Sequence, residues 1–527
     1  MKADKISYSC GALRFILLFI LPASLLVLPN SGCERYEIDS VDSGIFKKGH
    51  LEYTVLMEEP NSNTRTVSVR AGSTEISGDI KIPASVTFGG INYSVTEIEW
   101  NAFEGCSSLT RIVIPDSVTK IGSVAFLGCS SLTSIEIPDS VTEIGWGAFA
   151  GCSSLTEIIV GESNSNYSSL GGVLFNKGQT TLIQCPGSKS GTTYTIPDNV
   201  TSIDGMAFSK CSKLGSIIIP DSVTKIGWGV FSECSSLTEI IVGENNPDFS
   251  SLEGVLFNKD QTTLIQCPCG KSGTYTIPDN ITEIGDFAFS GCASLTNVTI
   301  GEGVTSIGYQ AFDGCRSLIS IVIPDSVTSI DDMAFSECSS LTRIVIPDSV
   351  TKIGSSAFAD CTGLTSIVIP DSVTEIDEYA FGGCSSLTEI IVGESNPNYS
   401  SLDGVLFNKD QTTLIQYPGG KSGAYTIQDN VTEIGNCAFS GCSSLTSVTI
   451  PDSVTFIGIS AFSECSRLTA VYFKGNAPRL PIRTAFFPPS VIYYEPGTLG
   501  WTNSWYGSPT RGGGPTWDGR PTKEWVE

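Results

Sequence analysis

The sequence predicts a repeat solenoid, in which short coils of chain stack on one another and share one long core. Cysteine recurs at intervals of 23 residues, in runs along the 527-residue chain, and each such cysteine lies in the same sequence motif. The motif is clearest from Cys338 to Phe358, which reads CSSLTRIVIPDSVTKIGSSAF. Each copy holds one short β-like segment, so the coils are expected to build a long parallel sheet. The cysteines at this position are Cys106, Cys129, Cys152, Cys211, Cys234, Cys292, Cys315, Cys338, Cys361, Cys384, Cys442 and Cys465.

Residues 1–32 have the pattern of a secretion signal of the lipoprotein type. Basic residues precede an apolar stretch, 15–28, which Pro22 interrupts and which is too short to span a bilayer comfortably. Small residues then lead to Cys33, as in bacterial lipoprotein signals, where the cysteine becomes the lipidated first residue. Asn30 departs from that pattern, so an ordinary cleaved signal with an unmodified Cys33 is the alternative. Any attachment to a membrane is expected to be through a lipid anchor only.

Residues 33–90 are predicted to form a small N-terminal β cap. Alternating stretches such as 66–70 have the period of a strand with one buried face. A stack of coils exposes an apolar end, and terminal units with a polar outer face are needed to cover it.

One coil can be read as a path around the core. The segment 341–346 alternates as a strand, with Val345 facing outward, and Pro347–Asp348 makes a turn. The segment 350–354 returns to the core, and 357–361 closes the coil in a short helical or irregular segment. The phenylalanine of this closing segment recurs with the repeat and is expected to stack in a buried aromatic column.

The recurring cysteines are predicted to form a column of reduced, buried thiols, because they lie beside Phe and Leu in every copy. Adjacent coils would place their Cα atoms within disulfide range, but parallel Cβ vectors would strain the bond. Cys267 and Cys269, and likewise Cys437 and Cys442, lack a second ligand pair for zinc. No metal and no cofactor are therefore predicted.

The repeat L-x-x-I-x-I-P-x-x-V-x-x-I-G-x-x-A-F-x-x-C resembles the BspA-like, or Treponema-type, leucine-rich repeat. The resemblance extends from about Ile82 to Phe473 and implies a leucine-rich repeat solenoid over 91–473, with about sixteen coils and a parallel β-sheet. It also implies an irregular C-terminal cap with a flexible tail over 474–527. BspA-like proteins are surface lipoproteins of Bacteroides-like bacteria, which implies an exported, outer-membrane lipoprotein exposed at the cell surface.

Three longer units interrupt the 23-residue repeat, near 166–195, 246–276 and 396–426. They are copies of one another. In the last, 405–407 and 413–415 flank a polar loop, as two strands flank a hairpin. Each unit is predicted to add a small ribbon to the flank of the solenoid, with a structural role favoured over a dedicated site.

Catalysis is not predicted. His50 is the only histidine in the chain. The sequence therefore does not supply the histidines needed for Cys/His or Ser/His/Asp catalysis or for a zinc site bound by histidines. The acidic residues recur with the repeat, as turn formers do, whereas a glycosidase needs one unique carboxylate pair. The net charge of −25 also disfavours nucleic acid as a partner.

The outward strand positions are the predicted binding surface. They form a mostly apolar, β-branched stripe, which favours a macromolecular ligand, most simply a protein. The competing explanation is that branched residues suit any sheet surface. The resemblance implies adhesin-like, non-covalent binding of host or neighbouring-cell macromolecules. The alternative is a glycan-capturing surface lipoprotein that uses Trp501, Trp505 and Trp517. The candidate binding residues are Val113, Ile159, Ile218, Ile241, Val322, Val345, Val368, Ile391, Arg111 and Arg343.

The repeated Asp-Ser-Val sequence resembles a short O-glycosylation acceptor motif of exported proteins in Bacteroides-like bacteria. The competing explanation is turn chemistry alone, because the motif belongs to the repeat consensus. The candidate serines are Ser117, Ser140, Ser222, Ser326, Ser349, Ser372 and Ser453.

Overall fold

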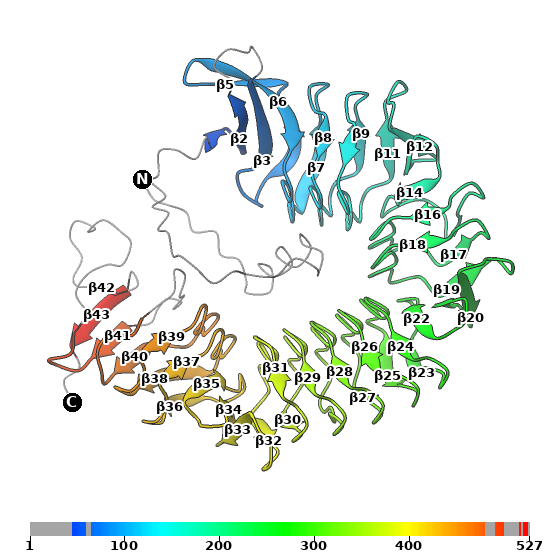
Figure 1. The fold of residues 1–527 in the computed structure, drawn as a ribbon. Coiled ribbons are helices and arrows are strands. Elements are labelled where there is room, and N and C mark those ends of the chain that lie inside the picture. The colour runs from blue at the N-terminus through cyan, green and yellow to red at the C-terminus, as the bar shows by residue number, and fades with distance from the viewer. Residues whose placement is uncertain (1–44, 59–64, 480–490, 500–515, 518–519, 525–527) are drawn as a thin grey trace. The chain divides into compact units, whose positions relative to one another are not determined.

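The computed structural model describes residues 45–58, 65–479, 491–499, 516–517 and 520–524, so the predicted signal and Cys33 lie outside the described residues. The chain forms a parallel β-solenoid of about 17 turns, and the described residues contain no helix. This confirms the predicted fold class. The segment that closes each coil consists of irregular turns (Figure 1).

Two compact units divide the chain, and each is described by itself. The N-terminal unit comprises Gly32–Ser272 with Gly285–Ser294, and the C-terminal unit includes Gly273–Ile284 and Leu295–Glu527.

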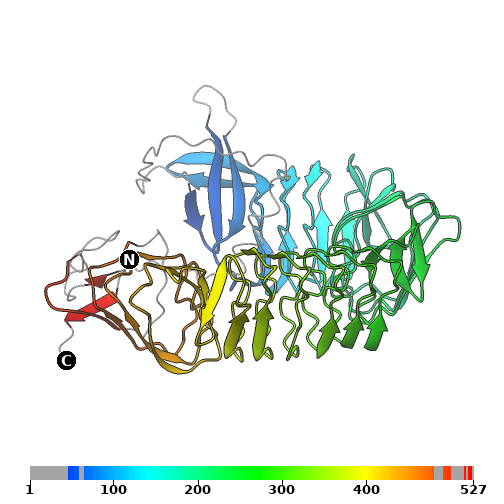
Figure 2. The same ribbon diagram turned by 60° about the horizontal axis from the view of Figure 1, so that its bottom comes forward.

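The described chain begins with a twisted sheet of longer strands, blue in Figure 2. Strand β2 pairs antiparallel with β1 and β3, β5 pairs antiparallel with β6, and β6 runs parallel to β3. Alternate side chains such as Tyr53, Val67 and Val95 are buried, as their period predicts. These strands are β1 (Ile45–Lys48), β2 (Leu51–Glu58), β3 (Arg65–Ala71), β5 (Ser85–Phe88) and β6 (Ile91–Ile98).

Nearly every coil carries a longer strand just before the turn that is Pro-Asp in the consensus, and we call this side of the coil the strand face. Neighbouring strands pair in parallel at a spacing of 23 residues, as Ile135 does with Ile158. In the N-terminal unit they are β4 (Ser77–Lys81), β7 (Ser108–Val113), β9 (Ser134–Ile137), β11 (Glu157–Val160), β15 (Thr193–Thr195), β17 (Ser216–Ile219) and β19 (Glu239–Val242). In the C-terminal unit they are β23 (Gly273–Thr276), β25 (Leu295–Thr299), β27 (Ser320–Val322), β30 (Ser366–Ile369), β32 (Glu389–Val392), β36 (Gly423–Thr426), β38 (Leu445–Ile450) and β40 (Ala470–Phe473).

A second, two-residue strand follows the turn in most coils, and we call this side the short-strand face. It also pairs in parallel from coil to coil, as Ile330 does with Ile353. The N-terminal unit contains β8 (Lys120–Ile121), β10 (Glu143–Ile144), β16 (Ser202–Ile203) and β18 (Lys225–Ile226). The C-terminal unit contains β24 (Glu283–Ile284), β26 (Ser306–Ile307), β28 (Ser329–Ile330), β29 (Lys352–Ile353), β31 (Glu375–Ile376), β37 (Glu433–Ile434) and β39 (Phe456–Ile457).

The predicted phenylalanine column is buried and stacked. The ring centroids of Phe335 and Phe358 lie 5.4 Å apart with an interplanar angle of 5°, and the ring of Phe126 stacks on that of Phe103 in the same way at 5.3 Å. Parallel stacking follows from the strand spacing, because each coil repeats the ring position of the one before it.

The column cysteines are buried and form no disulfide bonds, as predicted. A typical thiol, Cys361 Sγ, donates to the carbonyl oxygen of Phe335 at 3.1 Å, and Cys384 Sγ donates to Phe358 O at the same distance. Each thiol thereby satisfies a carbonyl at the close of the preceding coil. Burial raises the pKa of Cys384 to about 12, so the thiol is protonated and unreactive at neutral pH.

The residue before each column cysteine adopts a left-handed backbone conformation. It is often glycine, as at Gly314 with φ 69°, but Glu337 and Asp360 hold φ values of 55° and 56°. Glycine is favoured there because it lacks the Cβ atom that strains this region. The left-handed conformation before the cysteine is therefore a feature of the turn, and glycine is the residue that adopts it with the least strain.

The segment 341–346 is the exception on the strand face. The sequence predicts a strand here, but the structure assigns none, although Ile344 and Ile346 are buried as expected. The amide nitrogen of Thr365 lies 3.5 Å from Thr342 O, whereas that of Thr388 lies 3.0 Å from Thr365 O. The ladder is therefore stretched at this coil, while side-chain packing preserves the alternation.

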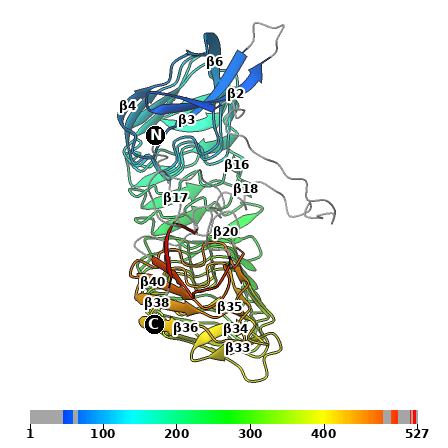
Figure 3. The ribbon, with the colours of Figure 1, turned by 90° about the vertical axis from the view of Figure 1, so that its left-hand side faces the viewer.

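The three longer units each form a three-stranded antiparallel ribbon, which confirms the predicted hairpin and adds one strand that the sequence did not predict. The β33–β34 hairpin is visible at the flank of the coils in Figure 3. The ribbons are β12 (Tyr167–Leu170), β13 (Val173–Asn176) and β14 (Thr181–Gln184); β20 (Phe249–Leu252), β21 (Val255–Asn258) and β22 (Thr263–Gln266); and β33 (Tyr399–Leu402), β34 (Val405–Asn408) and β35 (Thr413–Gln416).

A buried asparagine starts each ribbon. Asn396 Nδ2 donates to Pro370 O and Val373 O, both at 2.9 Å, and its Oδ1 accepts from the amides of Asn398 and Tyr399. The side chain thereby joins the preceding coil to the first residues of the ribbon and fixes where the ribbon leaves the coil. Asn164 and Asn246 make the same contacts.

Beyond Phe473 the strand-face sheet continues. Strand β41 (Val491–Tyr494) pairs in parallel with β40, and β43 (Arg520–Glu524) pairs with β41 in parallel and with β42 (Thr516–Trp517) antiparallel. The sequence count of about sixteen coils stopped at Phe473, so strand β41 accounts for the additional turn.

Candidate binding surface

An unbroken apolar stripe crosses four successive coils of the C-terminal unit. Val322 and Val345 are each 60% exposed, Val368 is 51% exposed, and Ile391 is 39% exposed. Each alternates with buried isoleucines of the same segment, so the period that fills the core also directs these side chains outward. Val345 and Arg343 lie in the coil without an assigned strand, yet both are exposed.

The corresponding positions of the N-terminal unit form a broken stripe. Val113, Ile159 and Ile241 are exposed, but Ile218 is only half-buried and Glu136 interrupts the series. Arg111 is exposed beside Val113. Among the predicted residues, those of the C-terminal unit therefore make the larger continuous apolar surface.

Ile319 is a further member of the stripe that the sequence analysis missed. Its side chain is 51% exposed, in the same coil as Val322. Other coils carry threonine at this position, for example Thr342 and Thr365, and the change from threonine to isoleucine was the available signal. Beside it, Ser320 Oγ donates to Asn297 Oδ1 at 2.8 Å and links two coils.

The serines of the Asp-Ser-Val sequences hold neighbouring coils together. Ser349 Oγ donates to Val327 O at 2.6 Å, and Ser372 Oγ donates to Val350 O at 2.8 Å. A glycan on such a hydroxyl would remove the donated proton, so its attachment competes with an inter-coil hydrogen bond. The same bond is made by Ser117, Ser140, Ser222, Ser326 and Ser453.

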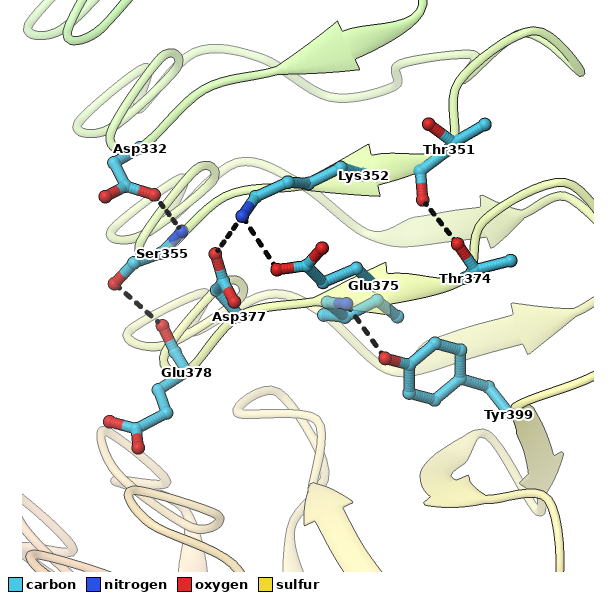
Figure 4. Close-up of polar contacts among 10 residues, drawn as sticks. Asp332, Thr351, Lys352, Ser355, Thr374, Glu375, Asp377, Glu378 and Tyr399 are labelled. Atoms are coloured by element: carbon cyan, nitrogen blue, oxygen red, sulfur yellow. Dashed lines mark hydrogen bonds and ion pairs between the residues drawn. The ribbon is translucent and has the colours of Figure 1, made fainter. Parts of the chain in front are cut away.

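One lysine on the short-strand face of the C-terminal unit pairs with two carboxylates of the next coil. Lys352 Nζ contacts Glu375 Oε1 at 2.7 Å and Asp377 Oδ2 at 3.2 Å (Figure 4). The hydrogen bond to Glu375 raises the pKa of Lys352. These groups are substantially exposed, so the pairs orient charge more than they stabilise the fold. Within the described ranges, no group of three histidine, cysteine or acidic side chains is placed to hold a metal ion.

The alternative glycan site is not covered by the described side chains. Trp501 and Trp505 lie outside the described residues, and only the backbone of Trp517 is described, in β42.

Comparisons with known proteins identify the repeat. The family model described as the BspA type leucine-rich repeat region matches residues 83–189, 187–272, 266–388 and 421–486. A leucine-rich cell surface protein from Faecalibacterium prausnitzii has 30% sequence identity, with 67% of this chain and 95% of that chain covered and a TM-score of 0.39. A leucine-rich repeat protein from Bacteroides ovatus has 26% identity, with 81% and 94% covered and a TM-score of 0.29. The pneumococcal vaccine antigen PcpA has 20% identity, with 86% and 94% covered and a TM-score of 0.31. No curated protein gives a significant match.

Proteins of this kind are surface proteins, and their repeats generally serve as binding scaffolds without catalytic activity. A search of the described residues for a helix of membrane-spanning length and hydropathy finds none. The family model covers well over half of the sequence, including every column cysteine. The chain therefore belongs to the BspA-type leucine-rich repeat family.

Proposed function

We propose that the protein is an adhesin-like surface protein that binds a host or neighbouring-cell protein on its strand face. The observation that carries the proposal is the exposed apolar stripe of Ile319, Val322, Val345, Val368 and Ile391. Apolar side chains that recur on one face without partners are typical of a protein interface, whose centre loses its water on binding. Repeated coils present them at regular spacing, which suits an extended partner.

The test uses the mature chain from Glu34, with extracellular-matrix proteins and a glycan array as probes. A variant with Val322→Lys, Val345→Lys and Val368→Lys places three charges at the centre of the stripe. Protein binding by the parent should fall at least tenfold in this variant, because each lysine side chain would have to be desolvated at the interface.

The matched control is Thr328→Lys, Thr351→Lys and Thr374→Lys. These threonines are exposed in successive coils of the same unit, on the short-strand face. Both variants add the same charge. The control also removes three threonine hydroxyls that donate to carbonyl oxygens of the preceding coil, so both variants are first checked for a native thermal transition. Equal binding by both would place the ligand elsewhere, and a ligand set restricted to sugars would favour glycan capture instead.

We further propose that Cys33 carries the lipid anchor and that the protein is an outer-membrane lipoprotein exposed at the cell surface. Growth with a labelled fatty acid should label the native protein, and Cys33→Ala should abolish the label.

O-glycosylation of the Asp-Ser-Val serines is proposed separately. Mass spectrometry of the native protein that finds Ser117 and Ser349 unmodified would dismiss it.

A further inference from the structure

Cys185 takes the place of a phenylalanine in the buried aromatic column. It ends the first ribbon, 23 residues before Phe208. Its amide donates to Ala207 O at 2.7 Å, as the amide of Phe126 does to the next coil at 2.8 Å. The third ribbon has Tyr417 at this position, and that ring continues the aromatic stack. A thiol is much smaller than an aromatic ring, so the substitution leaves space beside Cys185.

The thiol of Cys211 faces this space. In a regular coil the column thiol donates to the carbonyl oxygen of the phenylalanine 26 residues earlier, as Cys234 Sγ does to Phe208 O at 2.9 Å. Cys211 Sγ lies 3.8 Å from the equivalent oxygen, Cys185 O, and 3.7 Å from Pro186 O. Cys185 Sγ lies 3.8 Å from the same Pro186 O, and the two thiols are hydrogen-bonded to each other. The two sulfur atoms therefore converge, and the backbone holds both less closely than it holds the Cys234 thiol.

A small pocket leads from the solvent to the cysteine pair. Cys185 and Cys211 line it, together with residues that include Ser190, Gly191 and Thr193. The two cysteines are buried, whereas those three residues are exposed. The volume of the pocket is about 10 Å³, which holds about one water molecule. A reagent of that size can reach the pair, and a peptide cannot.

The pair recurs in the second ribbon and is absent at the same position of the third. Cys267 ends the second ribbon, and Cys292 of the following coil is hydrogen-bonded to it. A third thiol, Cys269, is hydrogen-bonded to Cys292 as well. In the third ribbon Cys442 is retained but Tyr417 replaces the other thiol. The first ribbon is therefore the simpler pair to test.

We propose that Cys185 and Cys211 form a reactive dithiol, which hydrogen peroxide oxidises to a disulfide. Proteins of this family are surface proteins, outside the reducing cytosol, where disulfides persist. The hydrogen bond between the thiols and burial raise the pKa of Cys211. Cys211 thus keeps its proton, and Cys185 is the sulfur that meets the peroxide.

The oxidation takes place in two balanced steps. The Cys185 sulfur attacks one oxygen of hydrogen peroxide, the O–O bond breaks, and the thiol proton leaves with the other oxygen as water, which gives a sulfenic acid. The Cys211 sulfur then attacks the sulfenic sulfur, the S–O bond breaks, and the hydroxyl group leaves with the Cys211 proton as a second water. Two electrons pass from the thiols to the peroxide. The product links the end of the first ribbon covalently to the next coil.

The test treats the reduced, folded protein with a small molar excess of hydrogen peroxide and, in parallel, with glutathione disulfide. The remaining thiols are alkylated in denaturant, and a tryptic digest is analysed by mass spectrometry without reduction. Peptides 178–189 and 211–213 should appear as one cross-linked species, two hydrogen atoms lighter than their sum. The preference for peroxide over glutathione disulfide should be about tenfold greater, or more, in the folded protein than in the urea-unfolded chain, because only the pocket selects by size.

Two matched variants locate the reaction. Cys185→Ser keeps the size of the side chain and removes its thiol, so peroxide should no longer consume the Cys211 thiol. Cys384→Ser removes a regular column thiol and should leave the cross-linked species unchanged. Both variants are first checked for a native thermal transition.

Several outcomes would overturn the proposal, and the parent protein alone is enough to reveal them. They are the absence of the cross-linked species after peroxide, a link from Cys211 to a cysteine other than Cys185, and an equal preference for peroxide in the folded and unfolded chains. The Val322, Val345 and Val368 lysine variant should form the cross-link as the parent does. Failure on the strand face and failure at this dithiol are thus separate results.

Discussion

The first and third ribbons share a polar scaffold and differ in what fills the space beside it. In both, a tyrosine hydroxyl accepts the amide proton of an isoleucine in the preceding coil at 2.8 Å: Tyr167 from Ile144 and Tyr399 from Ile376. Buried asparagines start both ribbons with the same hydrogen bonds. The recurring polar contacts therefore fix the backbone path, because none of these groups can be buried unpaired.

Beside this scaffold, two side chains from neighbouring coils face each other, and the two ribbons differ in which of the two is large. A Cβ atom on Gly147 would lie 3.6 Å from Met206 Sδ in the N-terminal unit, so a small residue there faces a large one. In the C-terminal unit the order is reversed, because the buried Tyr379 packs with Cys437. The larger residue of the facing pair thus comes from opposite coils in the two ribbons, and the Tyr379 and Cys437 pair is the bulkier of the two. The comparison teaches that the backbone is held by hydrogen bonds and that the side chains packed beside it can vary.

The largest expected effect concerns the column cysteines, of which Cys152 lies in the coil before the first ribbon and Cys384 in the coil before the third. Burial raises the pKa of Cys152 and Cys384 from 9.0 to about 12 each. The folded state thus keeps protons that the unfolded chain releases, so stability is intact below about pH 9 and is lost as pH rises from 9 toward 12. Each such thiol contributes a slope of at most about 1.4 kcal/mol per pH unit.

Urea unfolding at a series of pH values measures this slope. In the Cys384→Ala variant, the unfolding free energy should fall less steeply with pH above about pH 9, because one titrating thiol is absent. A stability that stays flat up to about pH 10.5 would mean that the thiols are not buried as a protonated column.

The second effect compares one position in two ribbons. The buried Tyr417 ring stacks on Phe439 with centroids 5.0 Å apart, whereas Cys185 is a small buried thiol. Tyr417→Ala should lower the unfolding free energy by about 3 kcal/mol, in the range for loss of a buried aromatic side chain. Cys185→Ala should lower it by about 1 kcal/mol, because little volume is removed. Similar losses would show that the two ribbons do not differ in packing.

The smallest effect compares Trp146 and Glu378, which hold the same position in the coils before the first and third ribbons. Trp146→Ala should lower the unfolding free energy by about 2 kcal/mol, less than for a fully buried tryptophan because the side chain is half-buried. Glu378→Ala removes an exposed carboxylate and should change stability by no more than about 0.5 kcal/mol. A large loss at Glu378 would mean that interactions of its carboxylate, such as the hydrogen bond from Asn436, hold the two coils together.

The sequence was sufficient for the features that repeat. Phe335 and Phe358, like the column cysteines, recur with the period of the coil, so local pattern alone places them in one buried column. The exposure of Val322 follows from the same alternation. These predictions needed no knowledge of how far apart two coils lie.

Features that depend on the separation of coils could not be predicted. The missing strand at 341–346 reflects a stretched ladder, and its residues match the consensus fully. The hydrogen bond from Asn436 to Glu378 joins residues that are 58 apart in the sequence and meet only because a ribbon intervenes. Asn396 is of a residue type that is common in exposed loops, so its burial could not be predicted. Its hydrogen bonds show that it fixes the start of the ribbon.

A threonine hydrogen bond that recurs between successive 23-residue coils also bears on how the gene can change. Thr328 Oγ1 donates to Thr305 O at 3.3 Å, and Thr351 Oγ1 donates to Thr328 O at 3.3 Å. If recombination between copies removed the intervening 23 residues, Thr351 would meet Thr305 in the register that Thr328 had left. The number of coils can therefore change by inheritance, and with it the length of the solenoid, while each remaining coil keeps the same fold.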